Sequence, residues 1–511
     1  MNGKKRQAGR GMRDAGCGTR GPGLEARGSG AASAGGSPGC SSGRDGRPHT
    51  PVSRLATDDW RLSLRIPRRV SGIPYLVALA LAFAAVLAPS RARAQTLSPA
   101  EQKIKAYVEQ HQADEVALLE HAVDIQSQTM DFAGVRHIGA LFRATLDSLG
   151  FETRWISMPD SVNRAGHLFA ERKGAHGKRV LLIGHLDTVL EGDELRWSRH
   201  DSIGAGAGSS DMKGGDVAIL YALKALNSIG ALNGTNIIVA MTGDEESAGD
   251  PLSISRGDLI AAAKRSDVAL AFEGGSPDNA TVARRGASGW ILTVTGRQAH
   301  SAGIFNPRVG YGAVFEAARI LDGFRQTLAG EQYLTFNPAI ILGGADVSYD
   351  STRIAGTAST KLNIISPKVI VHGDLRFISE EQKAQARAKM REIAEHDHLP
   401  GTSATISFQD EYPAMSPTKA NYALLATFDS VSQALGYGPV QALDAGKRGA
   451  GDVSFVAPFV TGLDGLGVSG GGAHTPKETV DLNSLPMATE RAAVLIYRLT
   501  HDQGRGAHAT P

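Results

Sequence analysis

Three short apolar runs, each followed at once by acidic or imidazole side chains, constrain the fold of this chain more than any other feature. Residues 179–184 (RVLLIG) precede HLD, residues 236–241 (NIIVAM) precede TGDEES, and residues 267–272 (DVALAF) precede EGG. Runs of this length, bounded by turn residues and separated by helical segments such as 216–229, are typical of parallel strands buried on both faces. The sequence therefore predicts an α/β fold with a mostly parallel sheet and helices on both faces.

The pattern changes in the middle of the chain, where an α+β unit interrupts the α/β pattern. Strands are expected there around 290–295, 359–365 and 369–377, with helices at 312–324 and 380–396. A chain of 511 residues exceeds what one hydrophobic core usually organises. We expect a catalytic domain in two parts on either side of an inserted domain, with bounds 95–282, 283–412 and 413–511.

The first 94 residues differ in composition from the rest of the chain. Residues 1–72 are rich in Gly, Arg and Ser without apolar periodicity, so we expect a disordered leader. Residues 73–94 contain an apolar run of signal-peptide length and end in Ala-Arg-Ala, which predicts cleavage after Ala94 and an exported, periplasmic or secreted protein. The run is shorter than a bilayer requires, so we expect cleavage and no stable membrane anchor after processing, with a retained N-terminal anchor as the alternative. Because a leader of this length is abnormal, we expect translation to begin nearer the apolar run.

Charge and cysteine content narrow the function classes. Residues 1–94 hold 16 Lys and Arg against 5 Asp and Glu, whereas residues 95–511 hold 38 against 47. The predicted mature chain is therefore acidic, and we expect no nucleic-acid partner. Both cysteines, Cys17 and Cys40, precede the predicted cleavage site, which excludes thiolates as metal ligands in the mature chain.

Polar side chains that can bind metal ions follow the apolar runs and lie in two glycine-rich loops. Parallel strands end at one edge of a sheet, where such side chains meet in a crevice. Two imidazoles and several carboxylates, without thiolates, suit zinc or a similar divalent cation. Two ions in a hydrolase are held about 3.5–4 Å apart, and we expect one carboxylate to bridge them. The candidate residues are His185, Asp187, Asp211, Glu245, Glu246, Glu273 and His474.

Each of these motifs is weak when taken alone. A histidine after a strand is more often structural, and a Glu-Glu pair is more often solvated surface. The joint pattern is what favours a metal centre. Asp187 follows His185 by two residues, so we expect its carboxylate to accept the second ring N–H of that imidazole. The pair Arg284-Arg285 would suit an acidic substrate side chain, although paired arginines usually lie in solvent.

The segments HLDTV, SSDMKGG, GDEES, FEGG and GGGAHTPKE, in this order and spacing, resemble one family of two-zinc metallopeptidases. That family contains glutamate carboxypeptidase (carboxypeptidase G), aminoacylase, acetylornithine deacetylase and succinyl-diaminopimelate desuccinylase. The resemblance runs over essentially all of 100–503 and is closest to the glutamate carboxypeptidase branch. It implies a zinc-peptidase-like catalytic domain, with the insert as a lid and dimerisation domain that makes the protein a homodimer.

The resemblance also implies roles for individual residues. His185 and Glu273 would hold one zinc ion, Glu246 and His474 the other, and Asp211 would bridge them. Glu245 would be the general base. In the lid, the resemblance implies that His300 (GRQAHSAG) reaches the reacting carbonyl, often from the partner subunit, and that Asn363 (KLNIISP) and Arg376 (GDLRF) hold the substrate carboxylate.

These parts predict hydrolysis of an amide bond adjacent to a free carboxylate, in a peptide or N-acyl amino acid. An N-acyl-amino-acid amidohydrolase or a dipeptidase with the same site is the alternative within enzymes. A non-catalytic binding protein on the same fold is a further alternative. It requires the loss of a ligand or base, and none is lost in this sequence.

Overall fold

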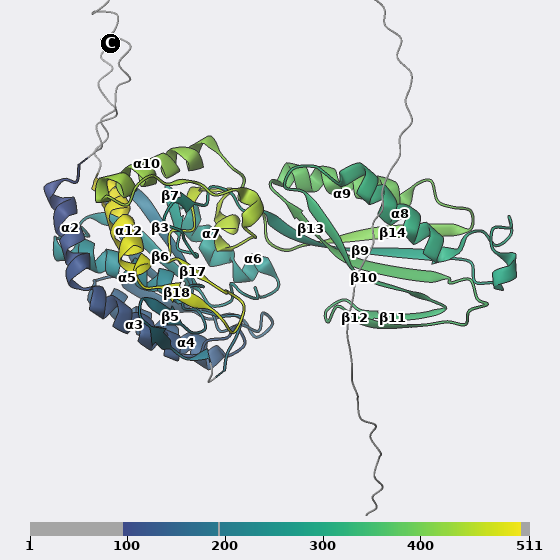
Figure 1. Cartoon of the computed structure of the whole chain (residues 1–511), viewed down its shortest axis with the longest axis horizontal. Helices are drawn as coiled ribbons and strands as arrows, with labels where there is room; N and C mark the ends of the chain where they lie inside the picture. Colours follow the sequence, from purple (N-terminus) through teal and green to yellow (C-terminus); the bar gives the residue numbers. More distant parts are fainter. Residues whose placement is uncertain (1–95, 193–194, 502–511) are drawn as a thin grey trace, which may run out of the picture. The chain divides into compact units, whose positions relative to one another are not determined.

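A six-stranded sheet forms the centre of the larger domain in the computed structural model, which describes residues 96–192 and 195–501 (Figure 1). Its order is β1-β2-β6-β3-β7-β16. β3 pairs in parallel with β6 and β7, and β16 with β7, whereas β2 is antiparallel to both of its neighbours. The predicted, mostly parallel sheet is confirmed. The bounds are β1 (Glu152–Ile156), β2 (His167–Arg172), β3 (His176–His185), β6 (Thr235–Thr242), β7 (Val268–Ala271) and β16 (Thr461–Leu463).

Helices cover both faces of this sheet because successive strand residues point to opposite sides. Val180 and Leu182 of β3 belong to one hydrophobic cluster, whereas Leu181 and Ile183 belong to another. The first cluster includes residues of α2 (Pro99–Gln110), α3 (Gln112–Asp124), α4 (Phe132–Ser148), α5 (Lys213–Ser228), α10 (Lys419–Leu435) and α12 (Ser484–His501). The second includes residues of α7 (Gly257–Ala263), which follows the short α6 (Leu252–Ser255), and of α11 (Asp452–Val456).

A small sheet joins segments that are far apart in the sequence. Its order is β17-β18-β5-β4, and the contact between β18 and β5 is antiparallel. A second, two-stranded pairing joins β15 to β8 in parallel. Neither was predicted, because strands this short carry no periodicity. The bounds are β4 (Ser198–His200), β5 (Ile203–Ala205), β17 (Gly470–Gly471), β18 (Thr479–Asp481), β8 (Asn279–Ala280) and β15 (Gln441–Ala442).

The inserted domain has an antiparallel sheet and a hydrophobic core of its own. Its order is β10-β13-β9-β14, and α8 (Gly312–Leu328) and α9 (Glu380–Glu395) contribute to the same core. We call this domain the lid. A two-stranded hairpin, β11–β12, belongs to it. The bounds are β9 (Gly286–Gly296), β10 (Thr335–Gly344), β11 (Asp346–Asp350), β12 (Ala355–Ser359), β13 (Lys368–Phe377) and β14 (Thr402–Asp410).

One predicted lid strand is wrong. The expected strand over 359–365 is a turn and loop, and β12 ends where that strand was expected to begin. The backbone carbonyl of Asn363 in this loop accepts from the backbone N–H of Ser301, which belongs to no strand. The strand β10 was missed because its side chains are mostly exposed on both sides and leave no alternating pattern.

The predicted leader (1–72) and signal peptide (73–94) lie outside the described residues. Among the residues that are described, no helix has the length and apolar character needed to cross a membrane.

Candidate metal centre

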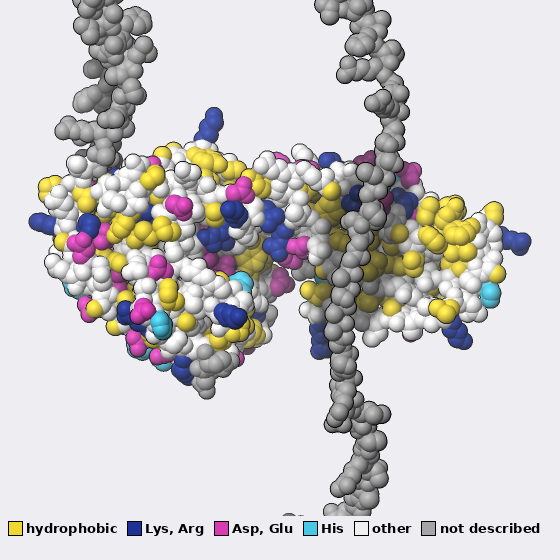
Figure 2. All heavy atoms as spheres, viewed as in Figure 1, with side chains coloured by type: hydrophobic (Ala, Val, Ile, Leu, Met, Phe, Trp, Pro, Cys, Tyr) yellow, Lys and Arg dark blue, Asp and Glu magenta, His cyan; other side chains and the backbone are white. Residues whose placement is uncertain are grey.

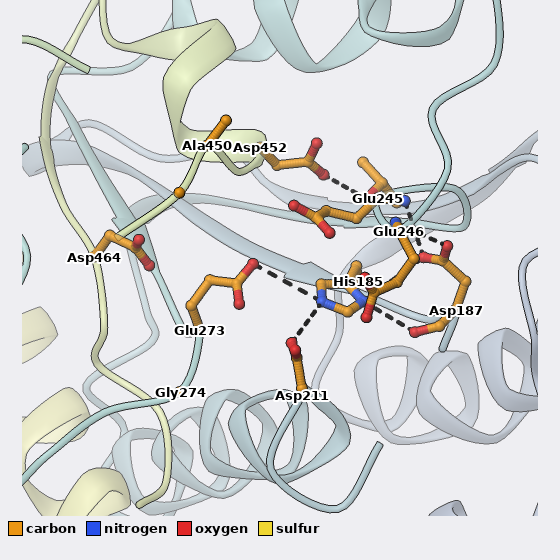
Figure 3. A network of polar contacts seen from close by, with 12 residues as sticks. His185, Asp187, Asp211, Glu245, Glu246, Glu273, Gly274, Ala450, Asp452 and Asp464 are labelled. Carbon is orange, nitrogen blue, oxygen red and sulfur yellow. Dashed lines mark hydrogen bonds and ion pairs between the residues drawn. The ribbon is translucent and has the colours of Figure 1, made fainter. Parts of the chain in front are cut away.

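Four of the side chains predicted to bind metal, those of His185, Asp211, Glu246 and Glu273, gather at one edge of the large sheet (Figure 3). His185 is the last residue of β3, and its register partner Thr242 is the last residue of β6. Glu245 and Glu246 follow β6 in the next loop, and Glu273 follows β7 by two residues. Because these neighbouring strands are parallel, their carboxyl ends bring the loops together.

Asp211 lies between two imidazoles. Its Oδ1 is 3.4 Å from His185 Nε2, and its Oδ2 is 3.2 Å from His474 Nε2. On the outer sides, Glu273 Oε1 is 3.8 Å from His185 Nε2, and Glu246 Oε2 is 3.1 Å from His474 Nε2. A carboxylate that offers a separate oxygen to each side is what two adjacent cations need as a bridge.

The two imidazoles differ in their surroundings. His185 is 1% exposed, whereas the side chain of His474 is 59% exposed. His474 lies in the loop between β17 and β18 with φ of 63°, a left-handed conformation that is costly for a residue with a Cβ. The loop therefore holds this imidazole toward Asp211 and Glu246 against a local backbone preference.

The donor atoms fit divalent cations. His185 Nδ1 lies 3.0 Å from the Asp187 backbone carbonyl, which favours the tautomer with the proton on Nδ1. Nε2 of the same ring is buried and has no hydrogen-bond partner among the described residues. An unprotonated nitrogen that faces Asp211 and Glu273 is a metal ligand position. Two overlapping groups have donor atoms within 4.8 Å of one another: His185 with Asp211 and Glu246, and His185 with Glu245 and Glu273.

The electrostatics of the cluster point the same way. Burial raises the pKa of Glu273 to about 7, and burial with the neighbouring Glu273 charge raises the pKa of Glu245 well above its usual range. Burial also acts to raise the pKa of Asp211, but the attraction of its carboxylate to the two imidazoles outweighs burial and holds the pKa below its usual range. Hydrogen bonds to Asp211 and Glu246 raise the pKa of His474 to about 10. Neighbouring carboxylates repel one another when they are ionised, so bound cations would be needed to keep this group of acids ionised together.

Asp187 orients the loop that carries the two adjacent glutamates. Its carboxylate accepts from the backbone N–H of Glu245 at 2.9 Å and of Glu246 at 3.1 Å, and from Thr129 Oγ1 at 2.7 Å. Its Oδ1 lies 3.6 Å from His185 Nδ1, further than its own backbone carbonyl. The sequence predicted that the carboxylate receives the imidazole N–H, whereas the structure gives that place to the backbone oxygen. Burial raises the pKa of Asp187 to about 6.

A second carboxylate orients the loop that carries Asp211. Glu478 accepts from the backbone N–H groups of Gly208 at 2.9 Å, Ser210 at 2.8 Å and Asp211 at 2.9 Å. The contact spans about 270 residues of sequence and depends on the pairing of β18 with β5. Sequence reasoning missed Glu478, although it lies four residues after His474 in the same motif.

A buried ion network lies beneath the Glu245 loop. Arg256 donates to Asp244 Oδ1 at 2.5 Å and to Asp452 Oδ1 at 2.7 Å, and all three side chains are almost fully buried. Tyr412 Oη donates to the backbone carbonyl of Glu245 at 2.6 Å. These residues were also missed by sequence reasoning. Asp244 belongs to the TGDEES motif, but nothing in the sequence around it identifies Arg256 as its partner.

Arg284 supports the opposite side of the centre. It is 4% exposed, its Nε donates to Asp464, and its Nη2 lies 3.8 Å from Glu273 Oε2. The positive charge acts against the burial that raises the pKa of Glu273. The expectation that paired arginines lie in solvent is wrong for Arg284, because Asp464 and the backbone carbonyl of Ala450 receive its N–H groups.

The three predicted lid residues make their hydrogen bonds within the lid. His300 Nδ1 accepts from the backbone N–H of Ala302 at 3.2 Å, and Ser301 donates to the backbone carbonyl of Asn363 at 2.9 Å. His300 and Asn363 are exposed. Arg376 on β13 pairs with Asp374 at 2.6 Å. Among the described residues, no hydrogen bond or ion pair joins these three side chains to the metal cluster.

This centre has the donor set and the adjacent free acid of hydrolases that use two divalent cations. The family comparison places the chain in that class. Residues 181–498 match Peptidase family M20/M25/M40, and the chain belongs to this family. It is a carboxypeptidase-like hydrolase of a metallopeptidase family, as the motifs predicted.

Two curated relatives span most of the chain. Carboxypeptidase G2 of Pseudomonas sp. (strain RS-16) is 27% identical over 407 residues, which cover 75% of this chain and 89% of the relative. Succinyl-diaminopimelate desuccinylase of Gluconacetobacter diazotrophicus is 26% identical over 386 residues, which cover 73% and 94%. The identities are modest, so they support the family and the general reaction rather than one substrate.

Solved structures share the fold. Aminopeptidase PepT from Bacillus cereus matches with a TM-score of 0.60 and 17% identity, covering 76% of this chain and 98% of that chain. The YXEP protein of Bacillus subtilis, described as a dinuclear metal binding peptidase from the M20 family, matches with a TM-score of 0.55 and 15% identity, covering 77% and 99%. The architecture of a catalytic domain with an inserted lid is thus that of the family.

Proposed function

We propose that this protein is an exported carboxypeptidase of the glutamate carboxypeptidase type, which cleaves an amide bond adjacent to a free carboxylate. The observation that carries the proposal is the position of Glu245. Its donor atom lies within 4.8 Å of those of His185 and Glu273, and no hydrogen bond engages its carboxylate within the described part of the chain. An acid that is held beside the metal ligands and is not consumed by packing is available as a base.

Glu245 then handles the proton of the reaction. Two bound cations supply activation of a water molecule and polarisation of the substrate carbonyl. Glu245 takes a proton from the attacking water and transfers it to the leaving amide nitrogen. Asp187 and Tyr412 hold the backbone of Glu245 from two sides, so the carboxylate keeps its direction during both transfers.

The lid supplies the groups that recognise the substrate. His300 is exposed and donates to the developing oxyanion, a contribution worth about 3–4 kcal/mol for one donor. Arg376 presents a planar guanidinium for a free carboxylate, and Asn363 offers an amide beside His300. A substrate carboxylate would compete with Asp374 for Arg376, since the two side chains now pair.

A homodimer through the lid is part of the proposal. Phe305, Val314 and Phe315 are 54%, 52% and 47% exposed, and Phe305 packs against Phe315 with ring centroids 5.4 Å apart. Figure 2 shows hydrophobic side chains gathered on the lid. An apolar group of this kind favours burial against a second copy. Light scattering of the purified protein measures the mass, and a monomer at all concentrations contradicts the dimer.

Zinc is the metal we propose, because imidazole and carboxylate donors without thiolates suit it. A second candidate function is an N-acyl-amino-acid amidohydrolase, which is favoured by the similarity to a desuccinylase over 73% of this chain.

Export rests on the leader alone. Sequencing the N-terminus of protein from the periplasmic fraction tests it, with Gln95 expected first, whereas an intact leader contradicts it.

The central experiment combines metal analysis with a substrate panel. The purified protein is assayed for zinc and for hydrolysis of C-terminal-residue peptides and N-acyl amino acids, beside Glu245→Gln. We expect two zinc ions per chain in both proteins and a loss of kcat of about 10²- to 10⁴-fold in the variant. Full activity in the variant removes Glu245 as the base. Normal activity of metal-free protein contradicts the whole mechanism.

A further inference from the structure

We propose that Tyr412 is a positioning residue that links recognition of the substrate carboxylate at Arg376 to the direction of the catalytic base, Glu245. The proposal rests on the proposed function. Tyr412 lies two residues after β14, on the segment by which the chain returns from the lid to the catalytic domain. Its Oη donates to the backbone carbonyl of Glu245 at 2.6 Å, although the two residues are 167 apart in the sequence. A hydroxyl at the edge of the lid therefore holds the loop that carries the base.

Two segments connect the lid to the catalytic domain, and they are hydrogen-bonded to each other. Arg284 and Met415 exchange backbone hydrogen bonds in both directions, each 3.0 Å long. The backbone N–H of Ala287 donates to the carbonyl of Tyr412 at 2.8 Å. Pro413 disfavours a helical backbone at the tyrosine that precedes it. The connection is thus a two-stranded ribbon, so a displacement of the lid sheet reaches Tyr412.

Arg376, Ala287 and Tyr412 lie in one row across the lid sheet. Arg376 of β13 is the register partner of Ala287 of β9, and Ala287 bonds to Tyr412 on the side of β14. Burial raises the pKa of Glu411, the residue before Tyr412, and the charge of Arg376 acts against that rise. A substrate carboxylate that takes Arg376 from Asp374 therefore changes the surroundings of the segment that carries Tyr412.

The ring of Tyr412 packs against the catalytic domain at its other end. Its centroid lies 5.0 Å from that of Phe455 on α11, and the guanidinium of Arg256 lies 5.4 Å from the centroid of the same Phe455 ring. Arg256 in turn bonds to the residue before Glu245. Asp187 holds the base loop from within the catalytic domain, whereas Tyr412 connects that loop to the lid.

This linkage predicts that a bound carboxylate raises kcat and not only affinity. Binding energy from a part of the substrate remote from the reacting bond can be used to align catalytic groups. A carboxylate that engages Arg376 would fix the lid segment, and with it the hydrogen bond from Tyr412 to Glu245. A substrate without that carboxylate would still reach the metal centre, but the base would be aligned in a smaller fraction of the complexes.

A pair of probes separates the two effects. The first is the panel compound with the highest kcat/KM, for example N-acetyl-L-leucine, and the second is its C-terminal carboxamide. The acyl product is measured for both, because the carboxamide contains a second amide bond. The metal-loaded wild type is compared with Tyr412→Phe, which removes only the hydroxyl, with Arg376→Gln and with the double variant. Tyr422→Phe, at a tyrosine of α10 that is 49% exposed, is the matched control.

We expect the wild type to hydrolyse the acid with a kcat about 10- to 100-fold above that for the carboxamide. Tyr412→Phe should lose about 10-fold in kcat toward the acid and less than about 2-fold toward the carboxamide, with KM for the acid unchanged. Added to Arg376→Gln, it should not reduce kcat further, since residues that act through one contact give non-additive effects. Zinc content and Tm should stay as in the wild type, and Tyr422→Phe should behave as the wild type.

Several results overturn the proposal while an active wild type leaves the proposed function intact. Equal kcat of the wild type toward both probes, or additive losses in the double variant, contradicts the link to Arg376. An equal loss toward both probes in Tyr412→Phe means that the hydroxyl aligns the base without the lid, and full kcat in that variant means that it does not align the base. Loss of zinc or a lowered Tm means that the hydroxyl only supports the fold. If the metal-loaded wild type hydrolyses no compound of the panel, the proposed function fails, and this inference fails with it.

Discussion

The catalytic domain and the lid keep their functional side chains in different surroundings. In the catalytic domain, His185 is buried at the end of a parallel strand and contacts both Asp211 and Glu273, which are themselves largely buried. In the lid, His300 and Asn363 are exposed, and the one recorded hydrogen bond of the His300 side chain is local, to the backbone N–H of Ala302. The first set is organised by the fold before any ligand arrives. The second set is available to meet a substrate, so metal binding and substrate recognition should respond to different substitutions.

The largest effect should come from the bridging carboxylate. Asp211→Asn leaves a poorer ligand between the imidazoles and should reduce the metal content below two ions per chain. We expect kcat/KM to fall by more than about 10³-fold, since both ions contribute to the reaction. Metal analysis and kinetics measure the two losses. A variant with two ions and normal activity would show that Asp211 does not bridge.

A lid substitution should separate catalysis from metal binding. His300→Ala should retain two ions per chain and lose about 10²- to 10³-fold in kcat, because one oxyanion donor is removed. His396→Ala, another exposed histidine of the lid, is the control and should behave as the wild type. Loss of metal in His300→Ala would contradict the prediction that lid residues affect catalysis and not metal binding.

A smaller effect should distinguish two buried glutamates, one in each domain. Glu316 in the lid bonds to Arg319 at 2.7 Å and His398 at 2.9 Å, and these bonds outweigh burial and lower its pKa. Glu115 on α3 has no hydrogen-bond partner in the described residues, and burial raises its pKa to about 8. At about pH 9, Glu316→Gln should destabilise the protein and Glu115→Gln should stabilise it, each by about 1–3 kcal/mol.

The pH dependence follows from the sign of each shift. Folded Glu115 holds its proton more tightly than the unfolded chain, so its contribution to stability falls as pH rises from about 4.5 to about 8. The ionised form of Glu316 is favoured by folding, so its contribution is lost only as pH falls through its lowered pKa. Calorimetry of both variants at about pH 5 and about pH 9 measures these changes. Equal pH dependence in wild type and Glu115→Gln would contradict the first assignment.

The central strands could be predicted from the sequence because each is marked by a local run of apolar residues. The apolar runs predicted β3, β6 and β7, and parallel pairing brought His185, Glu245 and Glu273 to one edge. The residues that support the site could not be predicted from the sequence. Glu478 contacts the Asp211 loop across about 270 residues, and Arg256, which also bonds to Asp244, contacts Asp452 across 196. Local patterns do not specify such pairs. The lid strand over 359–365 failed because its apolar residues do not share one buried face: Leu362 is fully exposed, whereas Ile365 is buried.

The contact between Glu478 and the Asp211 loop joins an early segment of the catalytic domain to a late one. β18 pairs with β5, and Glu478 precedes β18, so the loop that carries Asp211 receives this support only from a segment late in the chain. A nascent chain that stops before this segment carries most of the ligands without the geometry to use them. Contacts between distant segments form late in folding. We therefore expect the Asp211 loop to reach its final geometry only after the segment that carries Glu478 has been synthesised.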